Sequence, residues 1–213
     1  MFKLLWQKKF LIIFLAIILA LLPVAATKQP VVLSKALVTC IGIDYSDGVY
    51  SVYGEKVIFN FDPFGVLERK VLSGDGDSFE DAMREIERSF GRKISFTHCT
   101  LIILGNGLVE HNSRDEIVHL LEYFYERREL SNAAAVIHTT SDLEKLIETS
   151  NKLGDVQSGL LQRLVEFNRR DREKSFINLE DLFKRYKRGR PINIPIINEI
   201  DGALENEGNL HTI

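Results

Sequence analysis

Strand-like and helix-like stretches alternate along this chain, and this alternation restricts the possible folds more than any other feature. Apolar runs typical of strands occur at 37–43, at 49–53 with a continuation at 57–61 past an irregularity at Gly54, and at 66–72, 94–104 and 133–137. Amphipathic patterns typical of helices occur at 79–90, 113–125, 143–147, 160–167 and 178–186. The order ββ(β)αβαβααα predicts an α/β fold in which a mixed β-sheet is layered with helices in a single domain.

Capping residues mark the beginnings of these helices. They are Ser78 with Asp81, Ser113 with Glu116, Ser141 with Glu144, and Asn178. Such side chains accept hydrogen bonds from the free N–H groups of the first helical turn. Gly91 is expected to end the first helix, and Pro191 and Pro195 to end the helical section.

The first 26 residues have the composition of an export signal or signal-anchor. Their features are the positive residues Lys3, Lys8 and Lys9, an apolar run from Phe10 to Leu22, and the small residues Val24-Ala25-Ala26 before a cleavage point. The apolar stretch is near the lower limit of length for spanning a bilayer, so retention as an anchor is the alternative to cleavage. In both cases residues from Thr27 onward are expected outside the cytoplasmic membrane, or secreted if the chain is cut after Ala26.

The remainder of the chain is mildly acidic. Without the three lysines of residues 1–26, 24 of the 27 basic residues stand against 30 acidic ones, a net charge of −6. Nucleic acid is bound chiefly through excess Lys and Arg, so we exclude it as the main partner. Residues 27–200 are expected to form one domain, followed by a polar C-terminal tail at 201–213.

Motifs of catalysis and of metal or cofactor binding are missing from the sequence. There is no nucleophile elbow, no phosphate-loop lysine and no pair of closely spaced metal ligands. His98 and Cys99 are predicted to be neighbours on a strand, whose successive side chains point to opposite faces, so they cannot share a metal. We therefore predict a protein that is not an enzyme and has no catalytic, cofactor-binding or metal site.

The two cysteines lie in apolar, strand-like runs. Cys40 and Cys99 are expected to behave as small hydrophobic residues, with a disulfide as the alternative in an exported protein.

A glycine-rich stretch, Ser73-Gly74-Asp75-Gly76-Asp77-Ser78, leads into the first helix. The free N–H groups of a helix start favour an anion, but the two aspartates would repel a phosphate. The stretch also lacks the later ligands of an EF-hand calcium loop. We interpret it as a turn followed by a helix cap.

The most concentrated basic cluster is Lys184 to Arg190. Cations near the C-terminal end of a helix interact favourably with the helix dipole. We therefore interpret the cluster as helix-end charges that have no further role. Contact with anionic lipid headgroups is the alternative.

Three stretches carry a family likeness. They are Leu37–Asp44, which ends in Gly42-Ile43-Asp44; Gly74–Gly105, which contains Ser78-Phe79-Glu80-Asp81-Ala82 and Arg92-Lys93-Ile94-Ser95-Phe96-Thr97-His98; and Asn178–Ile197. Over roughly residues 35–200 the chain resembles the N-terminal domain of the C-subunits of nutrient germinant receptors, the Ger(x)C family of spore germination. The candidate family-motif positions are Asp44, Gly74, Gly76, Ser78, Arg92, Lys93 and His98, with structural roles as the alternative.

The resemblance implies a non-enzymatic subunit that assembles with integral-membrane receptor subunits at the outer face of the cytoplasmic or inner spore membrane. Family members usually carry a lipobox cysteine where this chain has Val24-Ala25-Ala26, and an arginine where it has Thr100. Membrane association is therefore expected through the N-terminal segment instead of through a lipid.

A secreted α/β enzyme or small-ligand-binding protein is the alternative function. Its crevice would lie near the C-terminal ends of the strands, around Asp44 and Gly105-Asn106-Gly107. A deep pocket with convergent polar groups would favour this alternative, whereas an exposed apolar patch would favour the receptor subunit.

Overall fold

The computed structural model describes residues 35–59, 67–91, 93–126, 133–153, 161, 163–164 and 176–211. The chain divides into two units, Met1–Lys35 and Ala36–Ile213, and the second contains the fold. Among the described residues no helix has both the length and the apolar composition needed to cross a membrane. The predicted signal or anchor at 1–26, Arg92 and most of the helix predicted at 160–167 lie outside the described residues.

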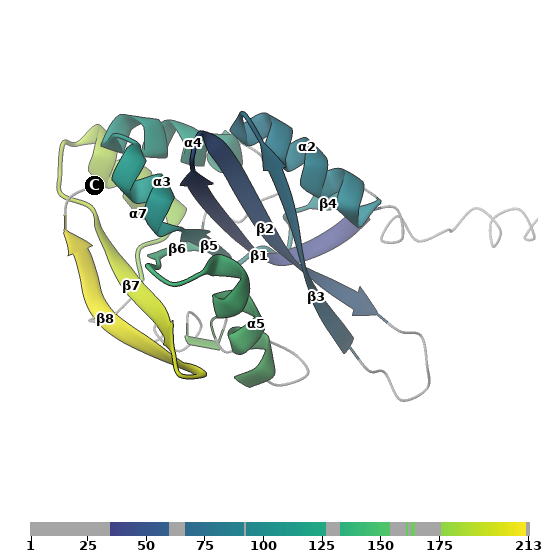
Figure 1. The fold of residues 1–213 in the computed structure, drawn as a ribbon. Coiled ribbons are helices and arrows are strands. Elements are labelled where there is room, and N and C mark those ends of the chain that lie inside the picture. Colours follow the sequence, from purple (N-terminus) through teal and green to yellow (C-terminus); the bar gives the residue numbers. More distant parts are fainter. Residues whose placement is uncertain are drawn as a thin grey trace, which may run out of the picture. The chain divides into compact units, whose positions relative to one another are not determined.

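Within the described residues, eight strands form one mixed sheet. Figure 1 shows their arrangement. They are β1 (Lys35–Ser46), β2 (Val49–Phe59), β3 (Leu67–Gly76), β4 (Lys93–Ser95), β5 (Leu101–Leu104), β6 (Ala135–His138), β7 (Asn193–Ile200) and β8 (Ala203–His211). The order across the sheet is β3-β2-β1-β5-β6-β7-β8, with β4 paired to β1. Strands β1, β5, β6 and β7 run parallel to one another. Strand β2 pairs antiparallel with β1 and with β3, and at the other edge β8 pairs antiparallel with β7. The predicted fold class is confirmed.

Helices cover both faces of this sheet (Figure 1). They are α2 (Phe79–Phe90), α3 (Asn106–His111), α4 (Arg114–Glu126), α5 (Leu143–Leu153) and α7 (Leu179–Lys187). One core joins the sheet to the apolar sides of α2, α4 and α7, and a smaller core joins the other face to α5. Alternate residues of the central strands supply the two cores: Ile102 and Leu104 belong to the larger, Leu101 and Ile103 to the smaller.

Helix caps explain why most helices begin where the sequence predicts. Ser78 accepts a hydrogen bond from the Asp81 N–H at 3.2 Å, and Asn178 accepts one from the Asp181 N–H at 2.8 Å. Ser113 and Glu116 form the predicted reciprocal box. These three caps are confirmed, as is the end of α2 at Gly91, which adopts a left-handed φ of 62°.

The cap predicted at Ser141 is wrong. The neighbouring Asp142 accepts the hydrogen bond from the Lys145 N–H at 2.8 Å. The Ser141 hydroxyl instead donates to the backbone carbonyl of Glu199 on β7, and the Glu199 N–H donates back to it. Ser141 therefore joins the start of α5 to the sheet.

The single strand predicted at 94–104 is wrong, because β4 and β5 are separate. A turn between them is closed by the Cys99 N–H, which donates to the Phe96 carbonyl at 2.9 Å. Phe96 and Cys99 are buried, so the apolar pattern continues through the turn and conceals it. His98 is exposed in this turn and not on a strand.

The C-terminal hairpin of β7 and β8 was not predicted, and β8 occupies most of the predicted polar tail. Two features conceal the hairpin. Pro195 lies in β7, although proline cannot donate to a strand ladder. Strand β8 is largely exposed and its sequence, ALENEGNLH, has little apolar content.

Cys40 and Cys99 are both buried and free. They belong to different cores, Cys40 to that under α5 and Cys99 to that under α2 and α4. Burial raises the pKa of both thiols, to about 12 for Cys99. Both cysteines therefore pack as small hydrophobic residues, as expected.

Candidate functional site

Asp44 caps α3, a helix that the sequence analysis does not predict. It ends the buried part of β1, and its Oδ1 accepts hydrogen bonds from the Tyr45 N–H at 2.9 Å and the Leu108 N–H at 3.0 Å. Leu108 lies in the first turn of α3, whose own N-cap residue, Gly105, has no side chain to offer. The Asp44 carboxylate therefore does for α3 what Ser78 does for α2.

The two glycines around this cap allow the close approach. A Cβ atom on Gly105 would lie 2.3 Å from Cγ of Asp44, and one on Gly107 would lie 2.0 Å from the carbonyl oxygen of Tyr45. At the place where the alternative function would have its crevice, the start of α3 therefore packs directly against Asp44 and Tyr45.

Gly74 and Gly76 form a second place of close packing, which we call the glycine seam. Both lie on β3, two residues apart and therefore on one face of the sheet, the face that α2 covers. A Cβ atom on Gly74 would lie 2.3 Å from the backbone nitrogen of Ile86, and one on Gly76 2.4 Å from that of Ala82. Helix α2 therefore packs directly against the backbone of β3.

The glycine seam corrects the interpretation of 73–78 as a turn. Strand β3 continues to Gly76 and pairs with β2 there, so only Asp77 and Ser78 connect strand to helix. The alternation of Gly74 and Gly76 was the signal in the sequence, because glycine at every second strand position marks close backbone approach.

The candidate family-motif positions that the structure describes do not come together in one site. The register of β1, β2 and β3 brings Asp44 and Gly76 to one end of the sheet. His98 lies near the other end of β1, where the Thr100 N–H donates to the Thr39 carbonyl at 3.0 Å. Lys93 is exposed at the start of β4.

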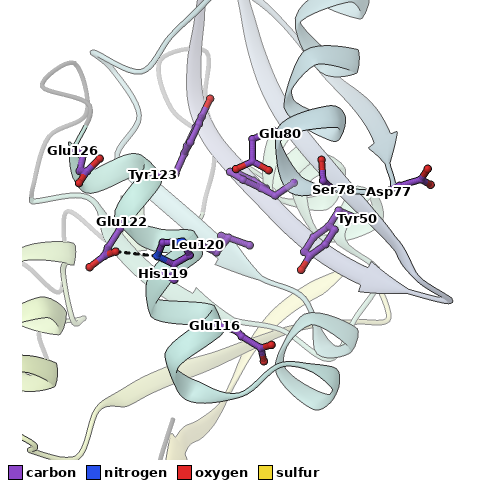
Figure 2. Close-up of a pocket in the computed structure, with 11 residues that line it drawn as sticks. Tyr50, Asp77, Ser78, Glu80, Glu116, His119, Leu120, Glu122, Tyr123 and Glu126 are labelled. Atoms are coloured by element: carbon purple, nitrogen blue, oxygen red, sulfur yellow. Dashed lines mark hydrogen bonds and ion pairs between the residues drawn. The ribbon is translucent and has the colours of Figure 1, made fainter.

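A groove lies between the start of α2 and one side of α4, and we call it the acidic groove (Figure 2). Its volume is about 440 Å³. Its walls carry five carboxylates, those of Asp77, Glu80, Glu116, Glu122 and Glu126. Ser78, the cap of α2, lies on the same wall as Asp77 and Glu80.

Charge in the acidic groove is almost entirely negative. His119 is its one basic lining residue among those described, and its Nδ1 lies 3.1 Å from Glu122. Hydrogen bonds from Ser113 hold the pKa of Glu116 below its ordinary value, so this side chain stays charged. Burial, and then the charges of Tyr45, Glu116 and Glu80, raise the pKa of the Tyr50 hydroxyl.

Aromatic rings form the floor of the acidic groove. The rings of Phe79 and Tyr123 meet edge to face with centroids 5.0 Å apart, and Phe124 packs against both from the core. Tyr50, on β2, also lines the groove (Figure 2). Anchored in the core in this way, the rings present a firm surface below the carboxylates.

A basic hollow of about 260 Å³ lies at the end of α7, lined by Asp181, Lys184, Arg185, Arg188 and Arg190. Lys184 pairs with Glu180 at 2.7 Å, and Arg185 donates to the carbonyl of Pro191 at 3.5 Å. These contacts fit the interpretation of the cluster as charges at a helix end. Among the described residues no three His, Cys, Asp or Glu side chains gather as a metal site would require.

Large apolar side chains are scarce on the described surface. Leu153 and Ile200 are the two that are more than a third exposed, at 44% and 37%. These two side chains are too few to form the exposed apolar patch that would favour the receptor subunit, as far as the described residues go.

Comparison with known proteins identifies the family. No curated protein and no solved structure matches the chain. Residues 32–199 match the family model described as the spore germination protein N-terminal domain, which covers most of the chain and the fold from β1 to β7. The resemblance of the three stretches is thereby confirmed, and the chain belongs to the family of spore germination proteins that carry this N-terminal domain.

Proposed function

We propose that this protein is a non-enzymatic, extracytoplasmic subunit of a nutrient germinant receptor-like complex. In this proposal the chain is tethered to the membrane by its N-terminal segment and acts by contact with integral-membrane receptor subunits. The family match over residues 32–199 is the observation that carries the proposal, because it assigns the chain to spore germination.

The placement of the family-motif residues supports a role without catalysis. Asp44 caps α3, Gly74 and Gly76 admit α2, and Ser78 caps α2. Each maintains a junction between a strand and a helix, and they do not converge on a common point as catalytic groups must. Such residues preserve a shape that other proteins bind.

Deletion of the gene tests the proposal. Spores of the deletion strain are expected to lose germination with at least one nutrient while germinating normally when nutrient receptors are bypassed by calcium dipicolinate. Restoring the full-length gene should restore the response. Normal germination of the deletion strain with every single nutrient would contradict the proposal.

Localisation tests the remaining part of the proposal. The protein is expected in the membrane fraction, and external protease should degrade it in spores whose coat has been removed. A chain whose first 26 residues are replaced by a cleavable signal should reach the same compartment but leave the membrane. Intact protein after protease treatment with a permeabilised control degraded would place it inside the cell and overturn this part.

A further inference from the structure

The acidic groove gathers five carboxylates in one hollow. Among the residues that the structure describes, no Lys or Arg forms an ion pair with Asp77, Glu80, Glu116, Glu122 or Glu126. On the same helix as Glu80, by contrast, Asp81 pairs with Arg84 and Glu85 with Arg88. The groove therefore brings together carboxylates that no described Lys or Arg neutralises.

Part of this charge lowers the stability of helix α4. Glu122 and Glu126 are four residues apart, so their carboxylates are neighbours on the helix surface, and like charges at this spacing destabilise a helix. A sequence that keeps a locally unfavourable arrangement at a hollow on its surface commonly does so for binding.

Groove length distinguishes a chain segment from a small molecule as the occupant. Glu116 and Glu126 are ten residues apart along α4, a rise of roughly 15 Å at 1.5 Å per residue. An extended segment of about five residues covers that length. Alternate side chains of such a segment would meet carboxylates from both walls, Glu80 on α2 and Glu116 to Glu126 on α4 (Figure 2).

Aromatic rings below the carboxylates complete a cation-binding surface. The edge-to-face pair of Phe79 and Tyr123 leaves the partly buried Tyr123 ring at the groove. A guanidinium or ammonium group between a carboxylate and an aromatic face gains both ionic and cation–π attraction. Arginine suits this combination best because its planar group both stacks and donates to carboxylates.

We propose that the acidic groove between α2 and α4 binds an extended, arginine- or lysine-bearing segment of a partner protein. The proposal rests on the proposed function, whose receptor subunits would supply the partner, and it names the chemistry by which that partner is recognised.

Binding of a labelled peptide to the full-length protein tests the proposal. The probe is a fluorescent hexapeptide with arginines at alternate positions, and its reference is the same peptide with citrulline in their place. The arginine peptide is expected to bind at least tenfold more tightly than the citrulline peptide, with an affinity that falls as salt rises. Equal binding of the two peptides, or none of the arginine peptide at millimolar concentration, would overturn the proposal.

Matched variants locate the binding. Glu80→Gln with Glu126→Gln removes one charge from each wall, whereas Glu144→Gln with Glu205→Gln removes two exposed charges elsewhere. The first pair is expected to weaken peptide binding at least tenfold and the second less than twofold. Tyr123→Leu, which changes no charge, should weaken it about threefold. Equal losses in the two double variants would mean attraction by net charge alone and contradict the proposal.

Two further measurements separate the possible failures. If free argininamide competes with the labelled peptide as well as unlabelled peptide does, the groove takes a small organic cation and a protein segment is excluded. If the Glu80→Gln, Glu126→Gln strain germinates normally while the deletion strain does not, the groove is not the receptor contact although the proposed function stands.

Discussion

The glycine seam and the acidic groove are neighbours in the sequence and opposite in construction. At Gly74 and Gly76 the backbone of β3 lies against the backbone of α2, and a single added Cβ atom would require α2 to move. From Asp77 to Glu80, immediately afterwards, charged side chains line an open hollow. One family stretch thus serves two purposes: the seam fixes where α2 lies, and α2 then holds one wall of the groove. Substitutions should act on stability at the first and on binding at the second.

Gly74→Ala is expected to have the largest effect on stability. Its Cβ atom would lie 2.3 Å from the Ile86 nitrogen and 2.7 Å from the Ala82 carbonyl oxygen, both backbone atoms that cannot turn aside. Overpacking of this kind costs about 3 kcal/mol. Urea unfolding followed by circular dichroism measures the loss.

Gly42→Ala is the matched control for the seam. It also lies in a strand of the sheet, but its Cβ atom would meet the end of the Leu143 side chain at 3.1 Å, which can rotate. If Gly42→Ala lowered the stability as much as Gly74→Ala, close packing at the glycine seam would not explain the effect of Gly74→Ala.

Asp44→Ala is expected to cost about 2 kcal/mol, because two backbone N–H groups, those of Tyr45 and Leu108, lose their acceptor. Asp44→Asn keeps an oxygen in the same place and should recover most of the loss in the same unfolding assay. If Asp44→Asn destabilised the protein as much as Asp44→Ala, the stabilisation would come from the negative charge of Asp44 and not from its hydrogen bonds to the helix.

Ser78→Ala is expected to cost about 1 kcal/mol, the usual value for an N-cap. Ser78 belongs to both regions, since it caps α2 and lines the groove. Ser78→Asn, which also caps and whose amide can donate to Asp81 as that of Asn178 donates to Asp181, should keep most of the stability of the wild type. Thermal unfolding of the two variants side by side would show whether the hydroxyl contributes anything beyond capping.

Local signals explain how much of the fold could be predicted. The caps at Ser78, Ser113 and Asn178 depend on residues three positions apart, and the central strands on continuous apolar runs. The short α3 could not be foreseen, because its cap, Asp44, is 64 residues away from Leu108 in the chain. Strand β8 was missed because an exposed edge strand has no apolar pattern to detect.

The candidate site shows the same limit. Asp44, Gly74 and Gly76 could be selected from the sequence by family likeness, but the role of Asp44 as a cap and of the two glycines as packing surfaces needed the structure; only the cap at Ser78 could be predicted from local sequence. The acidic groove could not be predicted at all. Its two walls come from α2 and α4, more than 30 residues apart in the chain, and nothing in either helix alone distinguishes a groove wall from an ordinary solvated face.

His138 offers a smaller, pH-dependent comparison between interior and surface. Burial lowers the pKa of its imidazole, whose Nδ1 lies 3.0 Å from the Leu104 carbonyl oxygen. The unfolded chain takes up a proton near pH 6.5, before the folded chain does. The stability that His138 contributes is therefore present above about pH 6.5 and lost as the pH falls towards the folded pKa.

Urea unfolding between pH 7.5 and 5.5 measures this contribution. His138→Asn, which can still donate to Leu104, should show a shallower loss of stability with falling pH than the wild type. His98→Asn, at an exposed position in the turn before β5, is the matched control variant. If both variants show the same dependence of stability on pH, His138 is not the source of the loss of stability at low pH.

Glu80→Gln with Glu126→Gln should have the smallest effect on stability, with no measurable change in the midpoint of urea unfolding. Both side chains lie on the open groove and pair with no Lys or Arg among the described residues, so neutralising them breaks no ion pair. The two charge effects offset each other, because Glu126 no longer repels Glu122 while the start of α2 loses the favourable charge of Glu80. A clear loss of stability would mean that the groove, like the seam, is part of the scaffold, and the contrast between the two regions would fail. An unchanged fold together with lost peptide binding would instead make the groove a surface whose charge is kept for a partner.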